Sequence, residues 1–194
     1  GALQKDTTAF EGIYINASSI DAVDMDQDGD PDLLICADAT PGAFGKSPTH
    51  ALFENDGQGH FREVTKEWIP ELEDFGSISD FTWADLNADG LVDLVAAGHW
   101  TPVAVFLNTG KGWQRAQNNG LDHTNGWWNC LEVADIDRDG DLDLIGGNWG
   151  LNSKFTASRS SPVNLYRADF DQNGSVEPLV TYYHNGVETP FASR

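Results

Sequence analysis

Acidic residues recur in this chain at a fixed spacing that suits a hard metal ion. Four nine-residue segments share the pattern Asp-x-[Asp/Asn]-x-[Asp/Asn]-Gly-x-x-[Asp/Glu], and they begin at Asp24, Asp85, Asp135 and Asp169. Side-chain oxygens stand at positions 1, 3, 5 and 9, and the glycine at position 6 permits the bend that turns them inward. Calcium takes about six to eight oxygen ligands in flexible geometry, so the pattern predicts a calcium loop in each segment.

The candidate ligands are the side chains at positions 1, 3, 5 and 9 and the backbone carbonyl at position 7. Fewer carboxylates in the second and fourth loops predict weaker binding there than in the first and third. Magnesium is the less favoured ion, because it keeps several waters and takes fewer carboxylates. The residues are Asp24, Asp26, Asp28, Asp30 and Asp32; Asp85, Asn87, Asp89, Leu91 and Asp93; Asp135, Asp137, Asp139, Asp141 and Asp143; and Asp169, Asp171, Asn173, Ser175 and Glu177.

Two other interpretations of the acidic segments compete with a calcium loop. Asp and Gly are common in plain turns, but four copies in register argue against turns alone. An EF-hand shares positions 1, 3, 5 and 6, yet it needs a Glu at position 12 and flanking helices. Position 12 is not Glu in any copy and lies in an apolar run that suits a strand: Ile35, Ala96, Gly146 and Val180.

Strands must hold these loops, because each loop stands between an alternating or apolar segment and a short apolar run. Segments 50–64 and 103–116 further show two strands around Asn-x-Gly-x-Gly-aromatic, which is typical of a tight turn. The repeating unit is therefore a four-stranded antiparallel blade, and the fold class is all-β, a partial β-propeller of about four blades. One short helical turn is expected within residues 65–73.

The repeats are expected around residues 14–75, 76–124, 125–160 and 161–194, within a single propeller segment that spans 1–194. Only 34 residues separate Asp135 from Asp169, so we expect a strand or connector to be missing from that blade. Blades of this architecture usually take about 40 to 50 residues.

The four acidic loops with their following strands, and the two Gly turns, resemble the FG-GAP or VCBS repeats of integrin α-subunit propellers and of secreted bacterial proteins. The resemblance covers about residues 20–185 and implies a calcium-binding propeller. Residues 144–194 further resemble the propeller region of bacterial surface proteins related to cartilage acidic protein, which are associated with ASPIC/UnbV modules. Because the family forms seven- or eight-bladed rings, four repeats imply a fragment of a longer protein, whose open faces favour self-association.

The formal net charge of −20 disfavours nucleic acid and anionic membrane surfaces as partners. No stretch approaches the roughly 18 apolar residues of a membrane span. Extracellular calcium modules bind at about 10⁻⁴ to 10⁻³ M, which predicts an extracytoplasmic setting: secreted, periplasmic or on the cell surface. The leading Gly1 is typical of a cleaved tag, so an export signal need not appear in the sequence.

A ligand site is expected at the far ends of the strands that leave the acidic loops. We expect a binding or adhesion module for a protein or carbohydrate, without catalysis. Two alternatives remain. One is part of a polysaccharide lyase or glycosidase that uses His99, His184 or a carboxylate pair as acid and base; the other is a structural spacer. Packing between blades competes as an explanation for the aromatic residues, including Trp127 and Trp128. The candidate ligand-binding residues are Asp38, His99, Trp100, Asn148, Trp149, Tyr183 and His184.

Cys36 and Cys130 are the two cysteines of the chain. Each lies in an apolar, strand-like context, so two buried free thiols are favoured over a disulfide.

Overall fold

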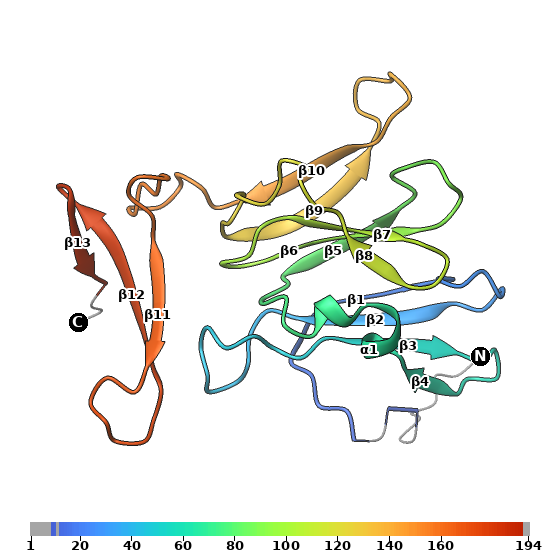
Figure 1. The fold of residues 1–194 in the computed structure, drawn as a ribbon, viewed down its shortest axis with the longest axis horizontal. Helices are drawn as coiled ribbons and strands as arrows, with labels where there is room; N and C mark the ends of the chain where they lie inside the picture. Colours follow the sequence, from blue (N-terminus) through green and yellow to red (C-terminus); the bar gives the residue numbers. More distant parts are fainter. Residues whose placement is uncertain (1–8, 11, 192–194) are drawn as a thin grey trace, which may run out of the picture.

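A computed structural model describes residues 9–10 and 12–191 and shows an all-β chain of four small antiparallel sheets (Figure 1). The first two sheets have four strands each, in the orders β1-β2-β3-β4 and β5-β6-β7-β8. Each is the blade that the sequence predicts, with an acidic loop after its first strand. Their strands are β1 Ala17–Val23, β2 Asp32–Ala37, β3 Ala51–Asn55 and β4 Phe61–Glu63, then β5 Asp80–Ala84, β6 Asp93–Ala97, β7 Ala104–Asn108 and β8 Trp113–Arg115.

The third and fourth sheets are smaller, so the prediction of four strands per blade is wrong for them within the described residues. The third pairs β9 (Trp128–Ala134) with β10 (Asp143–Asn148). After β10, residues 149–163 form turns and one isolated bridge between Ser158 and Ser161. No Asn-x-Gly-x-Gly turn occurs in that stretch to nucleate a hairpin, which agrees with the short spacing of the third and fourth loops.

The fourth sheet has the order β11-β12-β13. Asn185 and Gly186 have φ values of +52° and +79°, as a two-residue hairpin turn requires, and they join β12 directly to β13. This tight turn replaces the long connector found in the first two blades. The strands are β11 Asn164–Ala168, β12 Glu177–His184 and β13 Val187–Pro190.

The main hydrophobic core lies between the first two sheets. Leu34 and Leu52 of the first sheet and Leu94 and Phe106 of the second are almost fully buried in one cluster. The expected helical turn is present as α1 (Thr65–Trp68) followed by a 3₁₀ turn (Pro70–Leu72), and it adds buried apolar side chains to this cluster. The first two blades therefore share a core, as neighbouring propeller blades do.

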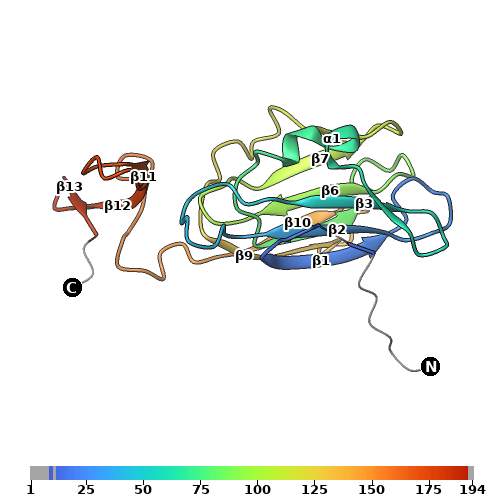
Figure 2. The same cartoon turned by 90° about the horizontal axis from the view of Figure 1, so that it is seen from below.

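The first strands of the first three sheets lie side by side, with β5 in contact with both β1 and β9. A second cluster joins the second and third sheets, where Leu131 of β9 packs against Val95 and Val105. The fourth sheet stands apart (Figure 2). Phe155 contacts it, with its ring 5.4 Å from that of Tyr182 and 5.3 Å from that of Phe191. Gly45, in the connector between β2 and β3, also lies against the side chains of Leu165 and Arg167 in β11.

Both cysteines are free, but only one is buried. Cys36 is fully enclosed, and burial raises the pKa of its thiol well above the ordinary value. Cys130 is exposed, which corrects the prediction of two buried thiols. Leu131 faces the second sheet, so the neighbouring Cys130 faces the opposite side of β9, which the displaced fourth sheet leaves open.

Candidate metal loops and an aromatic pocket

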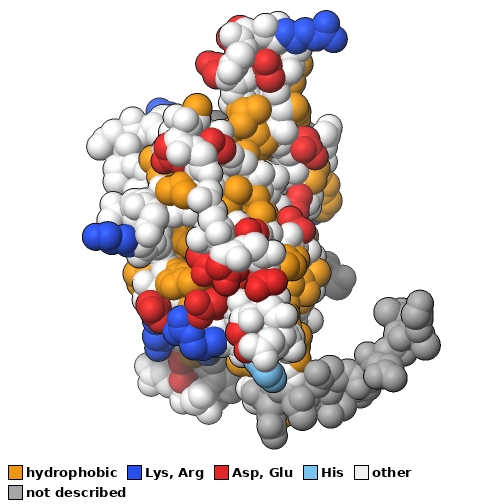
Figure 3. Space-filling model, turned by 90° about the vertical axis from the view of Figure 1, so that its right-hand side faces the viewer, with side chains coloured by type: hydrophobic (Ala, Val, Ile, Leu, Met, Phe, Trp, Pro, Cys, Tyr) orange, Lys and Arg blue, Asp and Glu red, His pale blue; other side chains and the backbone are white. Residues whose placement is uncertain are grey.

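Three of the four acidic loops lie at one end of the molecule. The loops after β1, β5 and β9, residues 24–31, 85–92 and 135–142, project to the right in Figure 1. Figure 3 looks at this end and shows Asp and Glu side chains gathered on it. The fourth loop, residues 169–176, points elsewhere because its sheet stands apart.

Every loop has the same internal hydrogen bond between its glycine and its first Asp. The glycine at position 6 has a positive φ, between +88° and +100°, which a side chain would resist. This conformation lets its N–H donate to one oxygen of the Asp at position 1. The bonds run from Gly29 to Asp24 (3.1 Å), Gly90 to Asp85 (2.8 Å), Gly140 to Asp135 (3.2 Å) and Gly174 to Asp169 (2.9 Å).

Two further bonds fix positions 3 and 5. In the first loop, the Asp28 N–H donates to Asp26 Oδ1 (3.2 Å) and the Asp30 N–H donates to Asp28 Oδ1 (3.0 Å). The same two bonds recur in the other three loops. The residue at position 4 is left-handed in every copy although none is glycine, and the acidic pattern gives no signal of this conformation. These residues are Gln27, Ala88, Arg138 and Gln172.

In the first two blades the carboxylate at position 9 is buried and ties the loop to its blade. Asp32 Oδ2 accepts the Met25 N–H (2.9 Å), and its Oδ1 accepts the Asn55 N–H at the end of β3 (2.9 Å). Asp93 makes the equivalent bonds in the second blade, from Leu86 (3.0 Å) and Asn108 (2.8 Å). Burial raises the pKa of both carboxyls above the ordinary 3.8, although the N–H donors oppose the shift.

In the third and fourth repeats the position 9 carboxylate keeps only the first of these bonds among the described residues. Asp143 accepts the Ile136 N–H (3.0 Å), and Glu177 accepts the Phe170 N–H (3.1 Å). No third strand with an Asn at its end follows in the third sheet. The loop is therefore anchored less firmly where the blade is incomplete.

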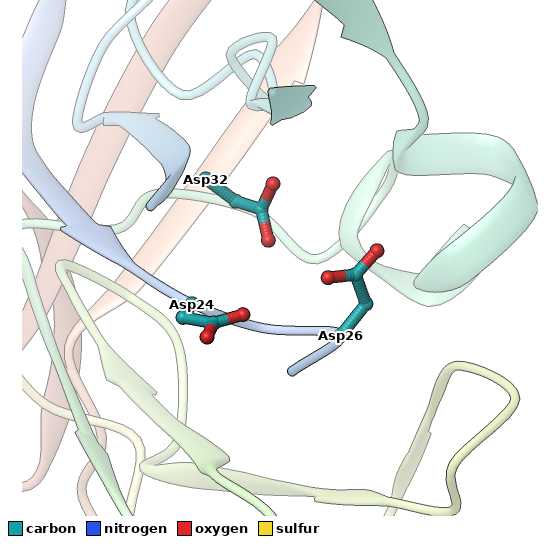
Figure 4. A group of neighbouring side chains, drawn as sticks. All are labelled: Asp24, Asp26 and Asp32. Atoms are coloured by element: carbon teal, nitrogen blue, oxygen red, sulfur yellow. The ribbon is translucent and has the colours of Figure 1, made fainter. Parts of the chain in front are cut away.

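Three loops bring carboxylates from positions 1, 3 and 9 together. In each group the oxygens lie within 4.8 Å of one another: Asp24, Asp26 and Asp32; Asp135, Asp137 and Asp143; Asp169, Asp171 and Glu177. Figure 4 shows the first group, with the three side chains turned toward a common point. These groups could hold a metal ion, since oxygen-only donor sets suit hard cations.

The first group carries a direct sign of a missing partner. Asp24 Oδ1 is buried and accepts no hydrogen bond, whereas its Oδ2 accepts the Gly29 N–H. Burial raises the pKa of Asp26, and the carboxylates of Asp28, Glu54 and Asp24 raise it further. A buried carboxylate oxygen without a donor, beside other carboxylates, fits a cation ligand.

The second loop lacks such a group of three carboxylates. Asn87 occupies position 3, and its Nδ2 donates to Asp89 Oδ2 at 2.9 Å. In the fourth loop the Asn173 amide likewise donates to Asp171 Oδ2 at 3.0 Å. In both loops one carboxylate oxygen therefore already accepts an amide N–H.

At the other end of the blades, three of the seven predicted ligand residues line one cavity of about 200 Å³. His99, Trp100 and Trp149 are joined there by Phe44, Trp127 and Asn129, and these six residues form what we term the aromatic pocket. Trp127 touches both other indoles, with ring centroids 5.4 Å from Trp100 and 5.3 Å from Trp149. Trp127 therefore packs against its neighbours, as expected, and also lines the cavity.

The remaining predicted ligand residues lie outside this cavity. Tyr183 and His184 belong to β12 of the displaced sheet, and Asp38 lies just after β2. Asn148 accepts the Gly150 N–H (2.7 Å) instead of lining the pocket. Trp127 and Asn129 lie where β9 begins. The start of a strand that enters an acidic loop lies at the same end of the sheet as the end of the strand that leaves the loop, and this is the signal that could have predicted them. Trp128, by contrast, packs inward and donates to the Thr124 carbonyl (2.8 Å).

The adjacent blades, with an Asp-rich loop after each first strand, define a repeat protein of the β-propeller type. The model of the FG-GAP-like repeat matches residues 43–96 and 85–146, which together make up more than half of the chain. The chain belongs to the FG-GAP-like repeat family. A comparison with curated proteins finds no match. Among the described residues, no helix is long and apolar enough to cross a membrane.

Proposed function

We propose that the chain is a calcium-stabilised binding module that holds a protein or glycan ligand without acting on it chemically. The observation that carries the calcium assignment is the first loop, where three carboxylates converge and the buried Asp24 Oδ1 has no partner. The donors are oxygens alone, as calcium prefers, with no imidazole or thiolate to favour zinc or copper.

Calcium in these loops has a structural role. Each loop joins the first two strands of a sheet. In the first loop burial raises the pKa of Asp26, and the neighbouring carboxylates of Asp28, Glu54 and Asp24 raise it further by repulsion. An ion that binds the folded loop and not the unfolded chain adds its binding free energy to folding. Calcium loops of extracellular modules bind at about 10⁻⁴ to 10⁻³ M and so require millimolar calcium to be occupied. We therefore place the module outside the cytoplasm.

A binding role is favoured over catalysis by where the histidines lie. His99 lines the aromatic pocket, whereas His184 ends β12 in the displaced sheet. Among the described residues no carboxylate lines the pocket, so His99 has no acidic partner in this lining for acid and base chemistry on a glycosidic bond. The pocket therefore offers surfaces for recognition and lacks a paired acid and base.

The test is a thermal melt in millimolar calcium against excess chelator, with magnesium as the comparison ion. We expect calcium to raise the melting temperature with concentration, since one site at 100 times its Kd adds about 2.7 kcal/mol. Asp24→Asn keeps an acceptor for the Gly29 N–H, so it should reduce the calcium shift without unfolding the loop. Asp135→Asn keeps an acceptor for the Gly140 N–H but gives up the bond from the Arg138 N–H, which water can replace at this exposed position, so it should reduce the shift as well. Asp74→Asn, an exposed site outside the loops, should leave the shift unchanged.

No calcium shift, or an equal shift with magnesium, would overturn the calcium assignment. If Asp74→Asn reduced the calcium-dependent rise in melting temperature as much as the loop variants do, the rise would depend on net charge and not on the loops.

A further inference from the structure

Backbone hydrogen bonds hold the aromatic pocket, one between the second and third blades and one within the third blade. The Trp100 N–H donates to the Gly126 carbonyl (2.8 Å), and the Trp149 N–H donates to the Trp127 carbonyl (3.0 Å). His99 and Trp127 further form an isolated β-bridge. The backbone segments that carry the three indoles are therefore joined before any ligand arrives, which lowers the entropic cost of binding.

Trp100 adopts a strained backbone conformation that its surroundings maintain. Its φ is +71°, in the left-handed region that a bulky residue rarely enters. Besides the bond to Gly126, the Asn125 side chain donates to the Trp100 carbonyl (2.9 Å). Such strain costs on the order of 1–3 kcal/mol and gathers at ligand sites, where the surrounding contacts hold it.

The pocket lining is uncharged in a chain that carries 31 acidic and 11 basic residues. Its polar groups are His99 and Asn129, with His99 Nε2 at 3.4 Å from Asn129 Oδ1. The nearby Lys154 ammonium lies over the Phe191 ring, 4.3 Å from its centroid, and not in the pocket. A charged ligand would find no counter-ion here, so the lining favours a neutral one.

The indole N–H groups of the pocket remain available as donors. Those of Trp100, Trp127 and Trp149 find no acceptor among residues 9–10 and 12–191. The indoles of Trp113 and Trp128, by contrast, donate to backbone carbonyls at 3.0 Å and 2.8 Å. A ligand of this pocket should therefore bring hydrogen-bond acceptors as well as an apolar face.

We propose that the aromatic pocket receives a single pyranose ring of a neutral glycan. A pyranose presents a face of C–H groups that packs on an indole, and its hydroxyls accept from indole N–H groups and bond with His99 and Asn129. The cavity of about 200 Å³ suits one ring and not an extended chain. This assignment rests on the proposed binding function and names its ligand class.

The test is titration of the 194-residue chain, in calcium, with methyl glycosides of glucose, galactose, mannose, xylose and N-acetylglucosamine. Ligand-detected NMR and tryptophan fluorescence report binding. We expect saturable millimolar binding of at least one glycoside, weakened about tenfold or more by Trp149→Ala. Trp149 is 55% exposed, so its loss should spare the fold. Asn129→Ala removes a polar contact, and Tyr14→Ala, at a side chain 92% exposed and outside the pocket, should change nothing.

Tetramethylammonium, tested in parallel, distinguishes a cation-binding cage from a sugar site. Binding of the ammonium with no glycoside bound would overturn the proposal, as would glycoside binding that neither Trp149→Ala nor Asn129→Ala weakens. The calcium melt is recorded on the same samples. A calcium shift without glycoside binding would reject the sugar pocket alone, whereas loss of the calcium shift would reject the metal assignment separately.

Discussion

The carboxylate at position 9 links metal chemistry to the fold of the blade. Asp32 is fully buried and accepts two backbone N–H groups, from Met25 at the loop and Asn55 at the end of β3. One side chain therefore connects the loop to two strands. The sequence indicates this residue as a ligand, but its bonds across the sheet depend on a register that a pattern of single residues does not specify.

Asp32→Asn should destabilise the chain even in chelator. An asparagine offers one acceptor oxygen, so one buried backbone N–H would face an amide NH₂ and lose its bond, at a cost of about 1–3 kcal/mol. Asp26→Asn is the matched change in the same loop and should be near neutral in chelator, because it relieves repulsion and keeps its acceptor for Asp28. Urea unfolding of both variants measures the difference, and equal effects would refute the linking role.

His50 gives the fold a pH dependence of its own. Its Nδ1 accepts the Ala37 N–H (3.2 Å), so its Nε2 carries the proton and donates to the Gly76 carbonyl (2.8 Å). Burial lowers the pKa of this imidazole below the ordinary 6.5. Because the folded pKa lies below the unfolded one, the neutral ring stabilises the fold above pH 6.5, and this contribution falls as the pH drops through the folded pKa.

His50→Gln should therefore lower stability at neutral pH and flatten its decline below pH 6.5. Denaturant midpoints of the variant and the parent across that range provide the measurement. The exposed His123→Gln is the control and should follow the parent. If the denaturant midpoint of the parent and that of His50→Gln fall equally steeply below pH 6.5, His50 is not the source of the pH dependence.

At the scale of strands and loops, local signals predicted most of what the structure shows. The Gly turns at Gly57 and Gly110 indicated the outer hairpins of the first two blades, and the close spacing after Asp135 indicated a reduced third blade. Within the described residues the fourth sheet has three strands where four were predicted. The two-residue turn of Asn185 and Gly186, which joins β12 directly to β13, was not predicted either.

The strands should differ in how readily they open. β6 lies between β5 and β7 and is buried along its whole length, whereas the outer edge of β10 has no partner strand among the described residues. Hydrogen exchange of β9 and β10 should therefore be about tenfold or more faster than that of β6 in chelator. Calcium should slow the exchange of β9 and β10. Uniform protection of the three strands would contradict this gradient.

Over the whole molecule, the placement of charge follows from the repeat. Sixteen of the 31 acidic residues lie in the four nine-residue segments, and three of the loops share one end (Figure 1). The sequence predicts the number of loops and their common end, because equivalent strand ends meet in a propeller. The displacement of the fourth loop depends on the chain between residues 149 and 163, which carries no repeat signal.

Crowded charge at one end predicts a salt effect. In chelator, sodium chloride should raise the melting temperature between about 0.01 and 0.1 M, as the Debye length falls from about 30 Å to about 10 Å. In saturating calcium the rise should be smaller, because bound ions already offset the loop charges. Melting curves in both conditions test this, and an identical salt slope would show that the loop charges are not its source.

The amide bonds inside the loops also bear on how quickly an ion exchanges. Backbone N–H groups already hold one oxygen of the carboxylates at positions 1 and 3, and the loop bends are set by left-handed residues at positions 4 and 6. An ion can then enter with little movement of the chain, so the rate at which the ion binds is set by how fast it loses its bound water. Differences in affinity among the loops would consequently appear as differences in residence time.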